Sequence, residues 1–412
     1  MQPEYNPSDP AVIANPYQVL QHLQDEDPVH WSDAINGWVL TRYDDVRAAL
    51  NDPRLSADRI TPFLDHLPAD ERAAVAEVGA MLGRWAVFVD PPLHTRLRSL
   101  MNKAFTTSAL AALRPRIAAI VERLLDEFVA SNETDFIAGF AYPLPATVIA
   151  GMVGVPDSDL DVFKSWSDDL ATFVGSAQAI PDKRDRAERS AVAMTEYFGE
   201  VIAHRRRHPI ADQSIIDHMI AARDGDDALS EAELVANSVL LLFAGHETTT
   251  NLFGNGLLAL LRNPDQLALL ADDPTLAASA VEEILRYDGP IGTSTRVAVE
   301  DVAFGNRTIK RGDRVFPMIN AANRDPRRFD DPHRFDIRRT DNRHIVFGYG
   351  IHFCLGAPLA RMEGEIGLTA LVRKLHDIEL LDPDPPWHDS LVLRGVSTLP
   401  IACRAGSYPK SR

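Results

Sequence analysis

The chain reads FGYGIHFCLGAP from Phe347 to Pro358, a glycine-rich stretch around the cysteine Cys354. Glycines on both sides of Cys354 allow the backbone to bend tightly around its sulfur atom. The sequence APLAR, which begins at Ala357, indicates a helix start, because proline is tolerated in the first turn of a helix. We therefore expect Cys354 just before a helix N-terminus, where free N–H groups and the helix dipole lower the pKa of a thiol and stabilise the thiolate.

Several uses of this thiolate compete. A zinc site needs further cysteine or histidine ligands at set spacing, and no second cysteine lies near Cys354 in the sequence. A cysteine hydrolase would pair the thiolate with a remote histidine, and it would not need glycines on both sides. A single axial thiolate to a haem iron needs one cysteine, a close backbone and a flat apolar neighbour, and Phe347 and Phe353 are available. A packed core cysteine is the ordinary alternative. We keep that interpretation for Cys403, whereas the glycine pattern argues against it at Cys354.

A long apolar helix is the second informative feature. Ser230 and Glu233 have the spacing of a capping box, and the apolar pattern ends before Pro264. A helix of about 32 residues is about 48 Å long, and one that is apolar all round must be buried. Yet its middle reads AGHETTT from Ala244 to Thr250. Because a central glycine costs about 1 kcal/mol relative to alanine and a buried carboxylate costs more unless it is partnered, this stretch indicates a functional site.

The helical spacing places the polar residues of this stretch around a small gap. Leu240, Ala244 and Thr248 share one face, and the small Ala244 leaves space on it. The Thr248 hydroxyl can either bond the carbonyl four residues back or point into that space. Glu247 lies about 100° around the helix, beside the groove. An alcohol in a cavity with an acid behind it suits proton delivery to a bound ligand. A polar kink in a core helix is the alternative.

The composition excludes several classes of protein. The 412 residues include 42 Lys plus Arg and 59 Asp plus Glu, which gives a net charge of −17 and argues against nucleic-acid binding. Two cysteines exclude a disulfide scaffold. The best membrane candidate, residues 137–156, contains three prolines, so we interpret it as a buried core segment. No signal peptide is visible, and we expect a soluble, cytoplasmic protein.

Helical periodicity dominates the chain and β-structure is confined to short stretches. Asn36-Gly37 between two apolar runs predicts a hairpin over residues 29–41. Further strands are expected at 295–299, 302–304, 314–317 and around 391–401. We therefore predict one mainly α domain over residues 1–412, with a small β portion mainly at 29–41, 293–317 and 385–403.

Together these features resemble the cytochrome P-450 family of haem-thiolate monooxygenases over nearly the whole chain. The loop fits the pattern Phe-x-x-Gly-x-His-x-Cys-x-Gly at every fixed position, and residues 244–249 fit the family's oxygen-binding groove. The resemblance implies the family's fold, with haem b between the long central helix and the helix after the cysteine loop. Cys354 would be the axial ligand of the haem iron, with Glu247 and Thr248 as the catalytic acid–alcohol pair.

The resemblance also assigns structural and cofactor-binding residues. Glu283 and Arg286 fit the family's Glu-x-x-Arg pair, and Arg334 in the sequence PHRF fits the third member of that network. Alone, such a pair at i, i+3 is more often a solvated ion pair. The expected propionate contacts are His94, Arg98, Arg296 and His352, of which the first two share a helix face. The other expected haem contacts are Phe347, Gly356 and Ala244.

The resemblance implies insertion of one oxygen atom from O₂ into a hydrophobic small molecule. Because no flavin or nicotinamide motif is visible, electrons would come from a separate ferredoxin or flavodoxin with its reductase. Residues 324–343, with seven arginines and five aspartates, could help to dock that donor. A monomer that binds neither membrane nor nucleic acid is expected. A peroxide-using haem-thiolate enzyme and a non-catalytic haem sensor or carrier are the alternatives.

The substrate pocket is assigned by family position alone. Its expected lining is mostly apolar, with no charged anchor, and residues 157–207 would form a mobile cover. The lining residues are Leu82, Val87, Phe88, Leu240, Phe243, Ala244, Ile291, Ser294 and Leu391.

Overall fold

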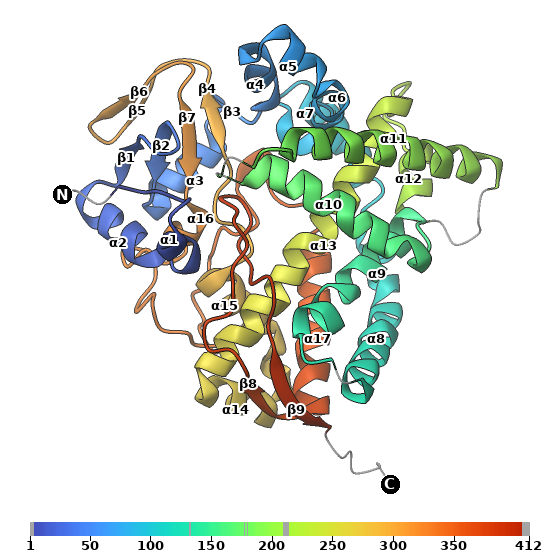
Figure 1. Cartoon of the computed structure of the whole chain (residues 1–412), viewed down its shortest axis with the longest axis vertical. Helices are drawn as coiled ribbons and strands as arrows, with labels where there is room; N and C mark the ends of the chain where they lie inside the picture. The colour runs from blue at the N-terminus through green and yellow to red at the C-terminus, as the bar shows by residue number, and fades with distance from the viewer. Residues whose placement is uncertain (1–3, 132, 177, 179, 209–213, 406–412) are drawn as a thin grey trace.

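Helix α13 (Glu231–Arg262) runs through the middle of the molecule (Figure 1). The computed structural model describes residues 4–131, 133–176, 178, 180–208 and 214–405. The predicted capping box is confirmed, because the Ser230 side chain accepts from the backbone N–H of Glu233 and the Glu233 side chain accepts from that of Ser230. The helix is buried along most of its length, as its all-round apolar sequence predicts.

Among the α-helices that contact α13, those with the most extensive contacts are α9 (Pro143–Val153), α11 (Lys183–Arg207), α15 (Ala277–Asp288) and α17 (Ala357–Lys374). The contact with α9 is close at Gly245, where a Cβ atom would lie only 2.7 Å from Cγ1 of Ile149. The glycine in the middle of α13 is therefore explained by helix packing as well as by the polar stretch that contains it.

The other helices surround this centre (Figure 1). They are α1 (Pro10–Ala14), α2 (Tyr17–Glu26), α3 (Tyr43–Asn51), α4 (Ile60–His66), α5 (Ala69–Ala73), α6 (Ala76–Leu82), α7 (Leu93–Asn102), α8 (Thr107–Ala130), α10 (Leu160–Gly175), α12 (Ile215–Ala221), α14 (Pro264–Asp272) and α16 (Ile319–Ala322). Residues 137–153 form a π-helical turn followed by α9, and most of their side chains are buried, so the interpretation of this segment as core is confirmed. None of the helices in the described residues has the length and apolar character needed to cross a bilayer.

A five-stranded sheet lies beside the helices, next to α2, α3 and α16 (Figure 1). Its order is β1-β2-β7-β4-β3, formed by β1 (Val29–Ser32), β2 (Gly37–Leu40), β7 (Arg314–Pro317), β4 (Arg296–Ala298) and β3 (Leu55–Ser56). The predicted hairpin is confirmed: β1 and β2 are antiparallel with Ser32 opposite Gly37, and Asn36 has the positive φ of 47° that such a turn requires. Strands β5 (Val302–Phe304) and β6 (Arg307–Ile309) form a separate hairpin.

The prediction of a strand around 391–401 is wrong. The terminal pair consists instead of β8 (Leu375–Leu380) and β9 (Ile401–Ala405), so the β portion extends outside residues 385–403. Residues 391–400 contact three different segments through isolated bridges, which join Ile291 to Leu393, Trp387 to Val396 and Asp135 to Pro400. Because no single neighbour runs alongside this stretch, its apolar residues fill gaps between elements instead of forming a ladder. The single domain over residues 1–412 stays a prediction.

Candidate active site

The loop that carries Cys354 bends tightly before α17, as the glycine pattern predicts. Gly348 and Gly350 have φ values of 75° and 71°, which favour glycine. The backbone N–H of Cys354 donates to the carbonyl oxygen of Phe347 at 2.9 Å, which closes the loop. Helix α17 then begins at Ala357 with a proline in its first turn. The sulfur is thus held just before a helix N-terminus, facing a cavity.

The net effect on the thiol differs from the prediction. Burial raises the pKa of Cys354, and the N–H groups of Gly356 and Ala357 and the charges of Arg98 and Arg361 lower it by less. The expectation of a lowered pKa is therefore wrong in its net direction, because desolvation outweighs the helix N-terminus. The predicted electrostatic contributions are present, however, and all of them favour the thiolate.

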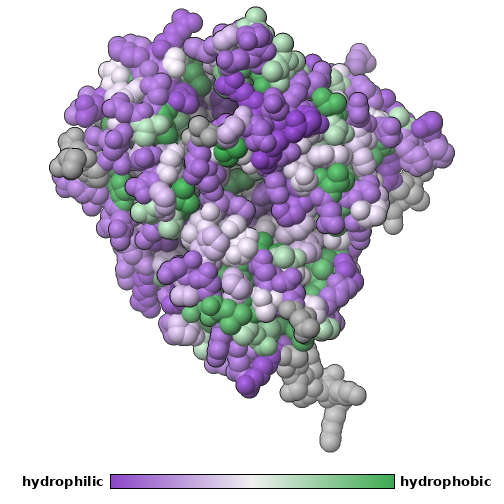
Figure 2. Space-filling view, viewed as in Figure 1, coloured by the Kyte–Doolittle hydropathy of each residue, from purple (hydrophilic) through white to green (hydrophobic). Residues whose placement is uncertain are grey.

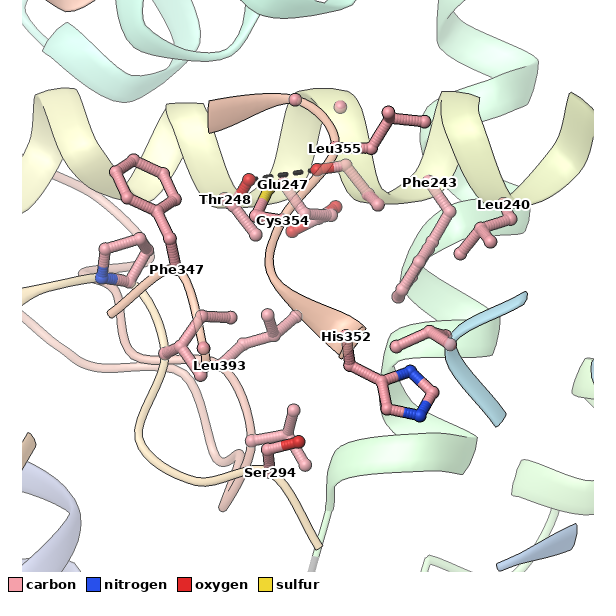
Figure 3. A pocket seen from close by; sticks show the side chains of 18 of the residues that line it. Leu240, Phe243, Glu247, Thr248, Ser294, Phe347, His352, Cys354, Leu355 and Leu393 are labelled. Atoms are coloured by element: carbon pink, nitrogen blue, oxygen red, sulfur yellow. Dashed lines mark hydrogen bonds between the residues drawn. The ribbon is translucent and has the colours of Figure 1, made fainter. Parts of the chain in front are cut away.

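Helix α13 forms the opposite wall of the cavity (Figure 3). Ala244 leaves an exposed gap on this wall, and Thr248 lies one turn further along the same face. Of the two alternatives for the Thr248 hydroxyl, the structure has the first, since its Oγ1 donates to the carbonyl oxygen of Ala244 at 2.9 Å. The proton of this hydroxyl is therefore engaged with the helix, and its lone pairs remain available as an acceptor.

Glu247 lies beside Thr248 and contacts a histidine that the sequence did not single out. Its Oε1 atom lies 3.2 Å from Nε2 of the buried His246. Nδ1 of the same ring lies 2.7 Å from the carbonyl oxygen of Leu242, so this nitrogen carries a hydrogen and donates it. Burial raises the pKa of Glu247, but His246, His388 and Lys164 together lower it further, so the net shift is downward. Glu247 is an ionised carboxylate that keeps hydrogen-bonding capacity next to the cavity.

Four nitrogen-bearing side chains meet at another side of the same cavity. The rings of His94 and His352 have centroids 4.2 Å apart, and Nδ1 of His94 is buried without a partner among the described residues. Arg98 donates to the carbonyl of Phe353 at 2.7 Å. Burial, followed by the nearby charge of Arg296, lowers the pKa of His352 to about 3, and burial lowers that of Arg296 to about 10. This concentration of donors is costly unless an anion compensates it.

Glu283 and Arg286 form a buried network behind the loop. Nε and Nη2 of Arg286 donate to the two carboxylate oxygens of Glu283 at 2.8 Å each, and neither side chain is exposed. The assignment of Arg334 as third member is wrong, because its side chain is 62% exposed and lies 3.7 Å from Asp336. Its contribution is the backbone carbonyl, which accepts from Arg286 at 3.1 Å. The side chain that joins the network is Arg339, whose Nε donates to Glu283 at 3.2 Å.

Most of the predicted substrate-pocket residues do line the cavity (Figure 3). These are Val87, Phe88, Leu240, Phe243, Ala244, Ile291 and Ser294. Leu82 does not, because it is fully buried in the core at the end of α6. Leu391 lines a second, adjoining cavity, which we call the outer chamber. The two residues after it, Val392 and Leu393, line the cavity that Cys354 faces, which we call the inner cavity. The residues expected to contact the cofactor all line the inner cavity: His94, Arg98, Ala244, Arg296, Phe347, His352 and Gly356.

Sequence reasoning missed two ionisable residues of the cavity wall, Glu363 and Arg59. Glu363 on α17 is 1% exposed, its Oε2 has no hydrogen-bond partner among the described residues, and burial raises its pKa to about 8. Arg59, which precedes α4, lines both the inner cavity and the outer chamber. No motif distinguishes either residue, so only the packing could reveal them.

Comparison with known proteins identifies the family. The cytochrome P450 family model matches residues 38–273 and 270–394. The chain belongs to the cytochrome P450 family. Cytochrome P450 107B1 of Saccharopolyspora erythraea is 44% identical over 384 residues, which cover 91% of this chain and 92% of that protein. The cytochrome P450 monooxygenase PikC of Streptomyces venezuelae is 39% identical over 403 residues, or 95% of this chain and 92% of that one.

The fold of this P450 agrees with solved structures. The structure of P450BioI in complex with an acyl carrier protein that carries hexadec-9Z-enoic acid superimposes with a TM-score of 0.88 at 34% identity, over 96% of this chain and 99% of that chain. The predicted family and fold are therefore confirmed, and so is an oxidoreductase of the haem monooxygenase class.

The residues of the cavity fit a haem. A haem carries two negatively charged propionates, and the cavity has a cationic side with an unpartnered buried nitrogen on His94. Cys354 offers its sulfur on the same cavity, between a wall that contains Phe347 and the gap at Ala244. A flat apolar group with an anionic edge is what these surroundings lack.

Proposed function

We propose that this P450 inserts one oxygen atom from O₂ into a hydrophobic small organic molecule, with haem b as cofactor and electrons from a separate ferredoxin or flavodoxin and its reductase. One observation carries the proposal: Cys354, the gap at Ala244 with Thr248, and the cationic group around Arg296 all face one cavity. When bound there, haem would supply the iron for oxygen activation, and Cys354 would hold that iron through its thiolate.

The residues of the chain have distinct tasks in this proposal. Cys354 would hold the cofactor through its sulfur, and Arg98 and Arg296 would neutralise the charge of the propionates. The neutral rings of His94 and His352 can each donate one hydrogen bond to them. The wall of Leu240, Phe243, Phe88 and their neighbours excludes water and accommodates an apolar substrate.

Thr248 and Glu247 are placed to bind water and to transfer protons beside the gap at Ala244. Because Thr248 Oγ1 donates to Ala244, its lone pairs can accept a hydrogen bond and fix a water molecule in the gap. Glu247 is held ionised beside it, with His246 at 3.2 Å. A carboxylate with an adjacent imidazole can accept a proton from one side and pass it to water on the other.

The exposed surface of the cysteine loop is a better candidate docking site for an electron donor than residues 324–343 are. Arg327 and Arg328 of that segment already pair with aspartates, at 3.3 Å and 3.0 Å. By contrast, Tyr349, Ile351 and Phe353 are exposed beside Cys354, with exposed fractions of 39%, 53% and 43%. An apolar patch above the cofactor is a suitable contact for a small redox partner.

The spectrum of the reduced, carbon monoxide-bound protein tests the class. The wild-type protein should show the red-shifted band of a thiolate ligand, and Cys354→Ala should lose it. Cys403→Ala is the matched control and should keep the band, because Cys403 packs against the hydrophobic core and does not line the cavity of Cys354. A wild-type protein without that band would contradict the proposal. A thiolate band without NADPH consumption through any ferredoxin or flavodoxin system would favour the haem sensor or carrier.

Replacement of Thr248 tests the proton pathway and separates oxygen activation from peroxide use. Thr248→Ala should uncouple turnover, so that reducing equivalents yield hydrogen peroxide instead of product. Thr172→Ala is a matched control, because Thr172 makes the same bond to the carbonyl four residues back, at 2.8 Å, on α10. Unchanged coupling in Thr248→Ala, together with full activity on added peroxide alone, would favour the peroxide-using alternative.

A further inference from the structure

An outer chamber between the sheet and the helices α4, α10 and α11 adjoins the inner cavity. Figure 2 shows a hollow on this face, with apolar surface inside and hydrophilic surface around it. The wall that the two spaces share is formed by Arg59, Val174, Gly175, Thr295 and Val392. Arg59 is the charged residue among these five, and it borders both spaces.

The guanidinium of Arg59 has no anionic partner in the described part of the chain. The salt bridges and hydrogen bonds of these residues do not include it, although it is half-buried. Its contact is with the ring of Phe88, whose centroid lies 4.3 Å from Cζ. Burial, followed by the charge of Arg296, lowers the pKa of Arg59 to about 9, so it stays protonated at neutral pH. A half-buried guanidinium without an anionic partner keeps its N–H donors available, and an anion bound there would accept charge-assisted hydrogen bonds from them.

The surroundings of Arg59 in the outer chamber are also cationic. Lys183 and Arg314 line this chamber, and they donate to backbone carbonyls without a carboxylate within 4.0 Å among the described residues. Arg184 lines it too and pairs with Glu71. Asp313 is the acid among the described lining residues, and its carboxylate accepts from an indole N–H and a backbone N–H. In a chain with a net charge of −17, this chamber is locally positive.

We propose that Arg59 binds the carboxylate of an amphiphilic substrate whose apolar body extends along Phe88 into the inner cavity toward Cys354. A carboxylate suits the site because the planar guanidinium can donate two parallel hydrogen bonds to it. Arg59 is set apart from the propionate-binding group because it borders the outer chamber, where neither Arg98 nor His352 reaches. This inference rests on the proposed function and narrows its substrate class to hydrophobic carboxylic acids.

Titration of the ferric holoenzyme with dodecanoic acid and with methyl dodecanoate tests this. The two probes differ only at the carboxylate, and binding is followed by the spectral change on displacement of the axial water. Dodecanoic acid should bind the wild-type protein about ten- to a hundredfold more tightly than the ester. Arg59→Gln should bind dodecanoic acid more weakly and the ester with unchanged affinity, so that the preference for the acid is lost. Arg59→Lys should keep part of this preference. Arg123→Gln is the matched control, because Arg123 lies on the surface of α8, where it pairs with Glu127 at 3.0 Å.

Several results would overturn the assignment. Equal affinity of acid and ester in the wild-type protein would do so, as would no binding of free dodecanoic acid when the same chain binds as a thioester on a carrier protein. A loss of haem from Arg59→Gln with unchanged preference for the acid would assign Arg59 to a propionate instead. The reduced carbon monoxide spectrum of the same samples keeps the two questions apart, because a thiolate band with no acid preference contradicts the role of Arg59 and leaves the monooxygenase proposal intact.

Discussion

Replacement of Glu363 by glutamine tests how strongly the cavity wall perturbs a buried carboxyl group. Glu363 lies on α17, is 1% exposed and has one oxygen without a partner among the described residues. Burial raises its pKa from 4.5 to about 8. The folded protein therefore keeps this proton over a pH range in which the unfolded chain has already released it.

The sign and size of the effect follow from this difference. Because the folded pKa is raised, the stabilising contribution of the protonated group is fully present below pH 4.5 and is lost as the pH rises through about 8. At about 1.4 kcal/mol per pH unit, and with partial ionisation at both ends, the wild-type protein should lose about 3 kcal/mol between pH 5 and pH 8 through this group. Glu363→Gln does not titrate and should not show this loss.

Urea unfolding of the holoprotein, followed by far-UV circular dichroism at several pH values, measures this difference. The quantity to compare is the change in the free energy of unfolding from pH 5 to pH 8, because the new amide can add a constant cost of its own. Glu365→Gln is the matched control, since Glu365 lies two residues further along the same helix, is 42% exposed and pairs with Arg114 at 3.3 Å. Parallel pH dependences in the wild-type protein and in Glu363→Gln would refute the reasoning.

Replacement of two further carboxylates, Glu283 and Glu282, gives predictions about the stability of the fold. Glu283→Gln should destabilise the fold by about 3–5 kcal/mol, because it leaves the buried charge of Arg286 uncompensated, and recovery of normal holoprotein with an unchanged melting temperature would contradict this. Glu282, whose pKa falls to about 2 because the hydrogen bonds and charges of His344 and Arg361 outweigh its burial, contributes stability above pH 4.5 that is lost as the pH falls through about 2. Glu282→Gln should therefore lose less of its melting temperature than the wild-type protein between about pH 6 and pH 3, and an equal loss would count against that ion pair.

Local patterns predicted those parts of the fold that depend on neighbouring residues in the chain. The capping box at Ser230 and Glu233 and the turn at Asn36 are satisfied by atoms a few residues away, so their sequence alone defines them. Strand β8 (Leu375–Leu380) is different, because it forms only when β9 (Ile401–Ala405) lies beside it. The apolar residues at 391–401 carried the stronger strand pattern, and they were used to fill space instead.

The candidate site shows the same division. Helical spacing was enough to place Ala244 and Thr248 on one face, and the family resemblance predicted that this face shares a cavity with Cys354, as it does. The choice between Arg334 and Arg339 was not, because both lie in an arginine-rich stretch and only the path of the backbone turns one of them inward. Nor could an apolar residue such as Leu82 reveal from sequence whether it faces the core or the cavity.

The ionisable side chains of this P450 differ in whether other residues of the chain already provide their hydrogen-bond and ion-pair partners. Glu283 is fully buried, yet its oxygens accept from Arg286, Arg339 and other donors, so nothing remains for a ligand to satisfy. His94, Glu363 and Arg59 differ from Glu283, because each lines the cavity that Cys354 faces and none has a charged partner among the described residues. Buried polar atoms without a partner also occur elsewhere in the core, for example on Ser167 and Asn251, so a missing partner does not by itself mark a ligand site. The position on this cavity is the additional observation that supports the proposed contacts, with a propionate at His94 and a substrate carboxylate at Arg59.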